Sequence, residues 1–184
     1  MPLNEQQRTL LISYRDKSYV SAILYEEHSN YYSFIHQIFS IPIILTSSAM
    51  TVINSSFNPE DMKIVNIILN ASTSLILSLV NNFRFNERAN NFKIASRKMN
   101  ALCHSIEDYI YNELDEGNIN MIRSFIKSYD DINDSLDYSL VNSIKKKITE
   151  KYKSSRTLPN ALNCISGSSG LFRRNSQEEE RINV

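Results

Sequence analysis

The sequence predicts an all-α protein: a two-helix transmembrane hairpin whose long second helix extends into a small cytosolic helical bundle. The 184 residues are about the length of one domain. Residues 29–59 contain no Asp, Glu, Lys or Arg, and a second charge-free run covers residues 64–83. Each run is long enough to cross the hydrocarbon core of a bilayer as a helix, which takes about 20 residues. An ordinary soluble helix would instead present a charged face to water.

This pattern divides the chain into four regions. They are an N-terminal amphipathic helix (1–31), the transmembrane hairpin (32–84, with spans at about 34–53 and 64–83), a cytosolic helical region (85–153) and an extended C-terminal tail (154–184). Between the spans, Asn58-Pro59 breaks the helix. Glu60 and Asp61 follow in the first turn of the next helix, where acidic side chains complement the helix dipole. The connection is short enough to force the spans into a hairpin.

Beyond the second span, apolar residues recur at helical spacing and predict a helix that continues without a break to near Gly117. The stripe consists of Phe85, Ala89, Phe92, Met99, Leu102, Ile106, Tyr109 and Leu114. Two shorter amphipathic helices are expected at about 118–131 and 139–153, where they could fold back on the long helix. The later composition of Ser, Gly, Asn and mixed charge is typical of a flexible tail. We expect this tail to contact other proteins of an assembly.

Polar residues in both spans fall at helical spacing, so that they form one face of each helix. This polar stripe consists of Ser33, Gln37, Ser40, Ser47 and Thr51 in the first span and Asn66, Asn70, Ser74, Ser78 and Asn81 in the second. Small and amide side chains pack closely and hydrogen-bond between membrane helices, which is the role we favour. The stripe could instead line a water path in a homo-oligomer. Pro42 is expected to kink or loosen the first span.

Basic residues predict the orientation of the hairpin in the membrane. They gather after the second span, at Arg84, Arg88, Lys93, Arg97 and Lys98. The connection between the spans holds only Lys63. The positive-inside rule therefore places both termini in the cytosol, or on the equivalent side facing a shell if the protein is part of a virion.

Several functional classes find no support in the sequence. The first 116 residues contain no glycine, which excludes a glycine-rich phosphate loop there. The three histidines and two cysteines show no metal-ligand spacing and no nucleophile–base arrangement. The formal net charge of zero argues against a nucleic-acid-binding protein, which needs a basic face. We therefore expect no catalytic residues, no metal, no cofactor and no nucleic-acid partner, and we expect that the protein is not an enzyme.

Three segments resemble a known family. They are IFSIPII in the first span, LILSLVNNFRFNERA across the end of the second, and FKIASRKMNALCHSIEDYI beyond it. Together they are similar to the two-transmembrane SLATT-type proteins, especially the versions encoded by large DNA viruses. The similarity covers roughly residues 10–153. One departure is the stretch DSLDYSL, which stands where the viral versions have a proline-rich element.

The resemblance implies a membrane protein without an enzymatic role. Its viral versions imply a structural, membrane-anchored component of a viral particle that links the inner membrane to a protein shell. Its bacterial versions are thought to act as membrane-disrupting effectors, which keeps an oligomeric pore-forming or channel-like protein as the alternative. A soluble helical adaptor is the third class. The expected partners are the lipid bilayer and other proteins of the assembly, with a homo-oligomer left open.

Overall fold

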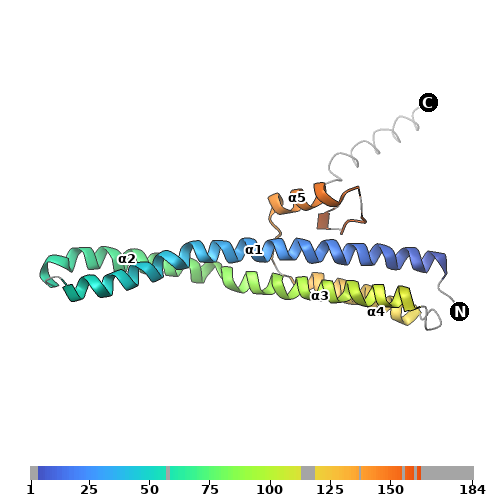
Figure 1. Ribbon diagram of the computed structural model, residues 1–184, viewed down its shortest axis with the longest axis horizontal. Coiled ribbons are helices and arrows are strands. Elements are labelled where there is room, and N and C mark those ends of the chain that lie inside the picture. The colour runs from blue at the N-terminus through green and yellow to red at the C-terminus, as the bar shows by residue number, and fades with distance from the viewer. Residues whose placement is uncertain are drawn as a thin grey trace, which may run out of the picture. The chain divides into compact units, whose positions relative to one another are not determined.

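The computed structural model describes residues 4–56, 59–112, 119–136, 138–154, 156–159 and 161–162. Its elements are the helices α1 (Glu5–Ser56), α2 (Pro59–Phe83), α3 (Phe85–Asn112), α4 (Ile119–Asp134) and α5 (Asn142–Tyr152) (Figure 1). Within these described ranges the only regular structure is helical, which confirms the predicted all-α class.

The chain divides into two compact units. One, which we call the apolar unit, is Ser29–Asn91 and holds both predicted spans. The other, the packed unit, consists of the described residues up to His28 and from Phe92 onward. Both α1 and α3 contribute to each unit, because the boundaries fall inside these two helices.

In the apolar unit, the second half of α1 and α2 run side by side (Figure 1). The least exposed side chains recur at helical spacing, with Met50 of α1 and Val80 of α2 buried. The half-buried positions of the same two faces are Ile43, Thr46, Leu69, Thr73 and Ile76. Helix α1 continues through Pro42, so the proline does not end the helix. The expected kink at this residue stays a prediction.

The long helix expected after the second span is interrupted, contrary to the prediction of an unbroken helix. Helix α2 ends at Phe83 and α3 begins at Phe85. Arg84 between them has φ 48°, in the left-handed region that side chains other than glycine seldom adopt. Helical periodicity continues on both sides of this residue, so the apolar pattern gave no sign of the break. Gly117, the expected end of the helix, lies outside the described residues.

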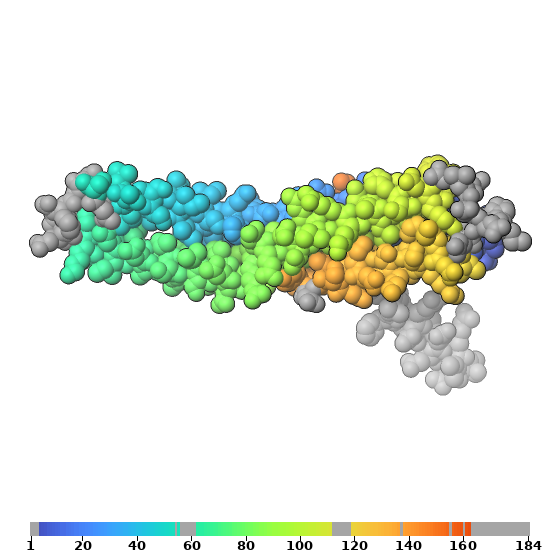
Figure 2. Space-filling model, turned by 90° about the horizontal axis from the view of Figure 1, so that it is seen from below, coloured from blue at the N-terminus to red at the C-terminus, as the bar shows by residue number. Residues whose placement is uncertain are grey.

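In the packed unit, α1 lies between α5 on one side and α3 with α4 on the other (Figure 1). The two helices α3 and α4 lie next to each other (Figure 2), and the rings of Tyr109 and Phe125 make an edge contact between them. The apolar stripe predicted for α3 supplies much of the core, with Phe92, Met99 and Ile106 fully buried. This part of the stripe is confirmed.

Small residues let α1 approach its neighbours closely. Ser18 and Ser21 are buried, and the Ser96 hydroxyl of α3 donates a hydrogen bond to the Ala22 carbonyl of α1. The Tyr25 hydroxyl of α1 likewise donates to the side-chain oxygen of Asn133 in α4. The Ser21 hydroxyl lies 3.5 Å from the Tyr129 hydroxyl, whereas the buried Ser18 hydroxyl has no hydrogen-bond partner within the described residues.

The packed region extends beyond the boundary expected at residue 153. Leu158 and Leu162 are buried, and the Arg156 guanidinium lies over the ring of Tyr19 at 4.2 Å from its centroid. Arg156 also pairs with Asp16 of α1 at 3.4 Å. The sequence hid these contacts because the apolar residues here are sparse and separated by polar ones. Residues 163–184 of the predicted tail lie outside the described residues.

Candidate functional site

The most extensive candidate surface of the apolar unit consists of its exposed hydrophobic side chains. They include Phe34, Ile41, Ile44, Leu45 and Val52 of α1 and Ile64, Ile67, Ile68, Leu75 and Leu79 of α2. Two helical stretches, Glu5–Ile53 and Met62–Tyr111, are long and apolar enough to cross a membrane. In the most apolar 18-residue window of each stretch only 6% of the residues are buried. In water so much exposed apolar surface would be costly, since each Å² adds about 25 cal/mol.

The polar stripe is also largely exposed. Gln37, Ser47 and Thr51 of α1 are exposed, as are Asn70, Ser74, Ser78 and Asn81 of α2, whereas Ser33, Ser40 and Asn66 are half-buried. The residues covered within the chain on α2 are instead Leu69, Thr73, Ile76 and Val80. Asn66 continues the spacing of this covered face, whereas Asn70, Ser74, Ser78 and Asn81 lie beside it. Sequence spacing alone could not show which of these residues face the neighbouring helix.

Some stripe hydroxyls have partners inside their own helix. The Thr51 hydroxyl donates to the Ser47 carbonyl at 3.0 Å, which is a usual arrangement for threonine in a membrane helix. The Ser40 hydroxyl lies 3.4 Å from the ring nitrogens of His36. The exposed Asn70 and Asn81 side chains need more partners than a hydroxyl does. Each amide has two N–H donors and one acceptor oxygen, and a single backbone carbonyl can accept only from the donors.

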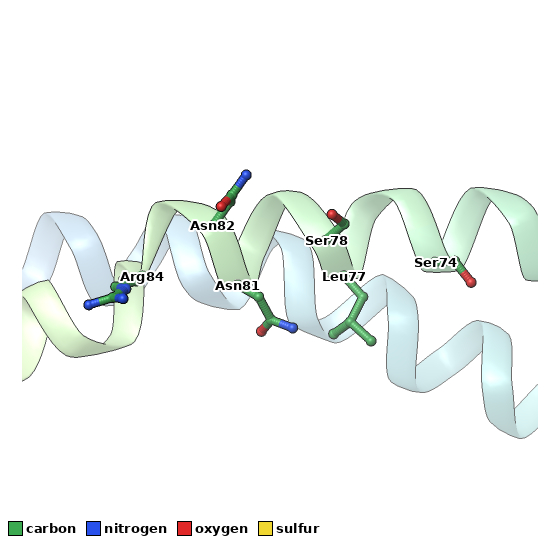
Figure 3. Close-up of a pocket in the computed structure, with 6 residues that line it drawn as sticks. All are labelled: Ser74, Leu77, Ser78, Asn81, Asn82 and Arg84. Atoms are coloured by element: carbon green, nitrogen blue, oxygen red, sulfur yellow. The ribbon is translucent and has the colours of Figure 1, made fainter.

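A shallow hollow of about 540 Å³ lies on the later part of this stripe. Its lining is Ser74, Leu77, Ser78, Asn81, Asn82 and Arg84 (Figure 3). The six side chains spread along α2 and the break at Arg84, and they project in different directions without converging on a common point (Figure 3). A small-molecule site requires polar groups that converge in a concave pocket, and this hollow does not have that geometry.

Aromatic and basic side chains gather where α2 gives way to α3. The Phe85 ring stacks on Phe83, with centroids 5.4 Å apart, and on Phe39 of α1, at 6.2 Å. The Arg88 guanidinium lies over the Tyr32 ring at 5.9 Å from its centroid. We call these five residues the aromatic–basic collar. Tyrosine and arginine at the ends of apolar helices are typical of the interface between lipid and water.

The five predicted topology-setting basic residues divide between the two units. Arg84 and Arg88 belong to the apolar unit, where Arg84 also pairs with Glu87 at 3.5 Å. Lys93, Arg97 and Lys98 are exposed on the part of α3 that belongs to the packed unit. All five follow the charge-free run of residues 64–83 in the sequence.

A second hollow, of about 310 Å³, lies in the packed unit. Its polar lining comes from Tyr25, Tyr129, Asn133 and the exposed carboxylates Asp130 and Asp134. Burial raises the pKa of Tyr25 and, together with other causes, that of Tyr129. Both phenols therefore stay protonated and act as hydrogen-bonding groups that join α1 to α4.

Cys103 and His28 are two further buried titratable side chains of the packed unit. Burial, with a smaller contribution from Glu107, raises the pKa of the Cys103 thiol to about 11, which makes it a poor nucleophile. His28 is fully buried and bonds to two backbone groups. Sequence reasoning missed His28, although it continues the four-residue spacing of the buried Leu24 and Tyr32. Among the described residues, no three His, Cys, Asp or Glu side chains form a group that could hold a metal ion.

No family model, curated protein or solved structure matches this chain. The exposed apolar helices, the outward polar stripe and the collar therefore carry the functional argument.

Proposed function

We propose that this chain is a non-enzymatic two-pass membrane protein. Its apolar unit crosses the bilayer as a hairpin, and the packed unit lies outside the bilayer as a platform for other proteins. In this account the segments before the first span and after the second face the same side. The protein serves as a membrane-anchored structural component, in keeping with the expected role of linking the inner membrane of a viral particle to its shell.

The observation that carries the proposal is the exposure of the apolar helices. A buried core helix of a soluble protein is covered by its neighbours, whereas the apolar windows here are only 6% buried. Leu75, for example, keeps 63% of its side-chain surface exposed in the middle of α2. Lipid chains would cover this surface without any further protein.

The collar and the basic residues support the orientation. Arg88 would lie at the membrane surface, where its guanidinium can reach headgroups and water while it packs against the buried Tyr32 ring. The excess of basic residues after Phe83 would keep this side of the chain in the cytosol or its equivalent.

Membrane retention of matched variants tests the proposal. The wild-type chain should remain in the membrane pellet after a carbonate wash and be released only by detergent. Leu75→Arg should reduce the fraction in the pellet, because arginine near the centre of a membrane helix costs about 3 kcal/mol in insertion measurements.

Ile119→Arg is the matched control. Ile119 is 56% exposed, close to the value for Leu75, but it lies on α4 of the packed unit. This variant should be retained like wild type. If both variants behave alike, or if wild type is recovered as a monomer without detergent, the soluble adaptor is the better description.

The polar stripe supports assembly through α2. Exposed amides such as Asn70 and Asn81 are unfavourable against lipid, so a second membrane helix that hydrogen-bonds to them would be stabilised. Replacing Asn70 and Ser74 by Leu should weaken this association by about 1 kcal/mol per lost hydrogen bond, measured as the dimer fraction in detergent at fixed concentration.

A pore is the second candidate function, favoured by the exposure of the same stripe. If the stripe lines water in an oligomer, wild-type protein in liposomes should release a trapped ion, and the change of Asn70 and Ser74 to Leu should stop the release. If the stripe only joins helices, neither protein should leak. We expect no leak, because residues 34–53 and 64–83 contain no Asp, Glu, Lys or Arg to mark an ion path.

A further inference from the structure

His28 connects three parts of the packed unit. Its side chain is fully buried on α1, and its ring packs against Phe92 of α3 with centroids 5.1 Å apart. One ring nitrogen, Nδ1, lies 2.7 Å from the Leu24 carbonyl oxygen. The other, Nε2, lies 2.8 Å from the backbone nitrogen of Val141.

These two contacts fix the protonation state of the ring. The Leu24 carbonyl can only accept, so Nδ1 must carry a hydrogen and donate it. The Val141 N–H can only donate, so Nε2 must be the bare nitrogen that accepts it. A doubly protonated imidazole has no acceptor and would place two N–H groups against each other. The contact with Val141 therefore requires a neutral His28.

Val141 is the N-cap residue of α5, and no side chain caps this helix. The His28 ring is thus the group that holds the beginning of α5 against α1. The other end is held differently, by the edge contact of Tyr19 with Tyr152 and by Arg156 against Asp16. Neither of these contacts involves an imidazole.

Burial is the main cause that opposes a second proton on His28. Burial lowers the pKa of His28 and Lys145 of α5 lowers it further, whereas the hydrogen bond to Leu24 and the nearby Glu27 of α1 raise it. On the α3 side the neighbour is the uncharged ring of Phe92, which also packs against Tyr138 ahead of α5. The native arrangement consequently favours the neutral ring.

We propose that His28 and the Val141 N–H form an acid-sensitive latch, and that protonation of His28 frees the beginning of α5 while the Arg156 end stays attached. The exposed ion pair of Lys147 with Glu27, 3.3 Å long, is the only direct α1–α5 ion pair at the latch end among the described residues, and such exposed pairs contribute little. The buried Thr149 hydroxyl of α5 also has no hydrogen-bond partner within the described part of the chain. Once the histidine is charged, this end keeps apolar contacts such as the buried Ile148 and the ring contact of Tyr138 with Phe92, but it loses the hydrogen bond that fixes the N-cap residue of α5 to α1.

The expected pH range follows from the two states of the ring. With the latch closed the pKa of His28 lies below 6.5, and with it open the ring is free to take its ordinary value of 6.5. The open state thus binds more protons as the pH falls below 6.5. The ratio of closed to open should fall by about tenfold per pH unit between pH 6.5 and the lowered pKa, and then level off.

Amide hydrogen exchange of the full chain in detergent micelles tests the latch. After correction for the intrinsic pH dependence of exchange, protection of the Val141 amide should fall between pH 7.5 and pH 5. The Leu162 amide, which donates to the Pro159 carbonyl at 2.9 Å near the Arg156 end, should keep its protection. Loss of both together would indicate global unfolding and would overturn the proposal.

Two variants test whether the pH dependence comes from the imidazole of His28. His28→Gln has no titratable ring, so its Val141 protection should not depend on pH in this range. His104→Gln removes an exposed histidine that pairs with Glu107 at 3.4 Å, and it should keep the wild-type pH dependence. An unchanged pH dependence in His28→Gln would contradict the latch.

If His28→Gln does not fold, wild type alone still decides the question. The imidazole ¹⁵N resonances should show hydrogen on Nδ1 at pH 7.5, and their titration midpoint should coincide with the loss of Val141 protection. A hydrogen on Nε2 at pH 7.5, or two separate midpoints, would overturn the proposal.

Discussion

The Ser29 hydroxyl donates a 2.8 Å hydrogen bond to the backbone carbonyl of Ala89, 60 positions further along the chain. Both residues are buried, with 5% and 4% of their surface exposed, so that α1 and α3 approach closely at this point. The bond joins the segment that precedes the first apolar span to the segment that follows the second. It belongs to the apolar unit, next to the collar residues Tyr32 and Arg88.

Ser29→Ala should lower the free energy of unfolding by about 1 kcal/mol, the usual net contribution of one hydrogen bond. Ser29→Leu should lower it further, because a larger side chain does not fit between two close helices. Denaturant titration of the detergent-solubilised chain measures both changes. Ser105→Ala is the control, since this exposed hydroxyl bonds only to Ala101 of its own helix, and it should change little. Equal effects at both serines would contradict the assigned contact.

Phe92 is a core residue of the packed unit at the start of its α3 segment. It is fully buried, and its ring contacts those of Tyr25, His28 and Tyr138. Phe92→Ala should lower the free energy of unfolding by about 3–5 kcal/mol through lost contacts and the cavity left behind. Ile94→Ala, two positions along α3 and 42% exposed, should cost far less in the same titration. A small effect of Phe92→Ala would mean that this core is not formed.

The sequence predicted the helices but not how their faces pair. Apolar spacing located α3 and its buried Phe92, Met99 and Ile106, because a helix that covers a core must repeat every three or four residues. The same reasoning could not find the partner of His28, which lies 113 residues away. Contacts between residues far apart in the sequence depend on which helix faces lie against each other. The local spacing of apolar residues does not show this.

Arg84 shows a second limit of sequence reasoning. Its φ of 48° is a backbone conformation that costs roughly 1–2 kcal/mol for residues with a Cβ atom. Neither glycine nor proline marks the position, so the sequence contains no signal for the break. The sequence also could not predict that Asn70 and Ser74 are exposed. Helical spacing places residues on one face of a helix, but it does not show whether that face contacts another helix.

Arg84→Gly should therefore raise the free energy of unfolding, by up to about 1 kcal/mol, since glycine adopts positive φ without a steric penalty. Arg97→Gly is the matched control, because Arg97 lies inside α3, where glycine costs about 1 kcal/mol. The two identical substitutions should thus shift the thermal midpoint in opposite directions. A loss of stability in both would show that Arg84 is helical.

Cys103 should react slowly in the folded protein. Its pKa of about 11 leaves little thiolate at pH 8, and its side chain is only 3% exposed. In a Cys164→Ser background, alkylation by iodoacetamide should be at least about a hundredfold slower in the folded chain than in the unfolded chain, where the pKa returns to its ordinary value. Similar rates in the two states would place Cys103 at the surface.

Cysteine labelling in sealed vesicles tests the two-pass arrangement most directly. In a background with Cys103 and Cys164 replaced by Ser, one variant carries Ser55→Cys at the end of α1 and the other Ser124→Cys on α4, both at exposed positions. A membrane-impermeant maleimide should label the two sites from opposite sides of the vesicle, because the connection between the spans crosses the membrane while the packed unit does not. Equal labelling of both sites from the same side would contradict the account.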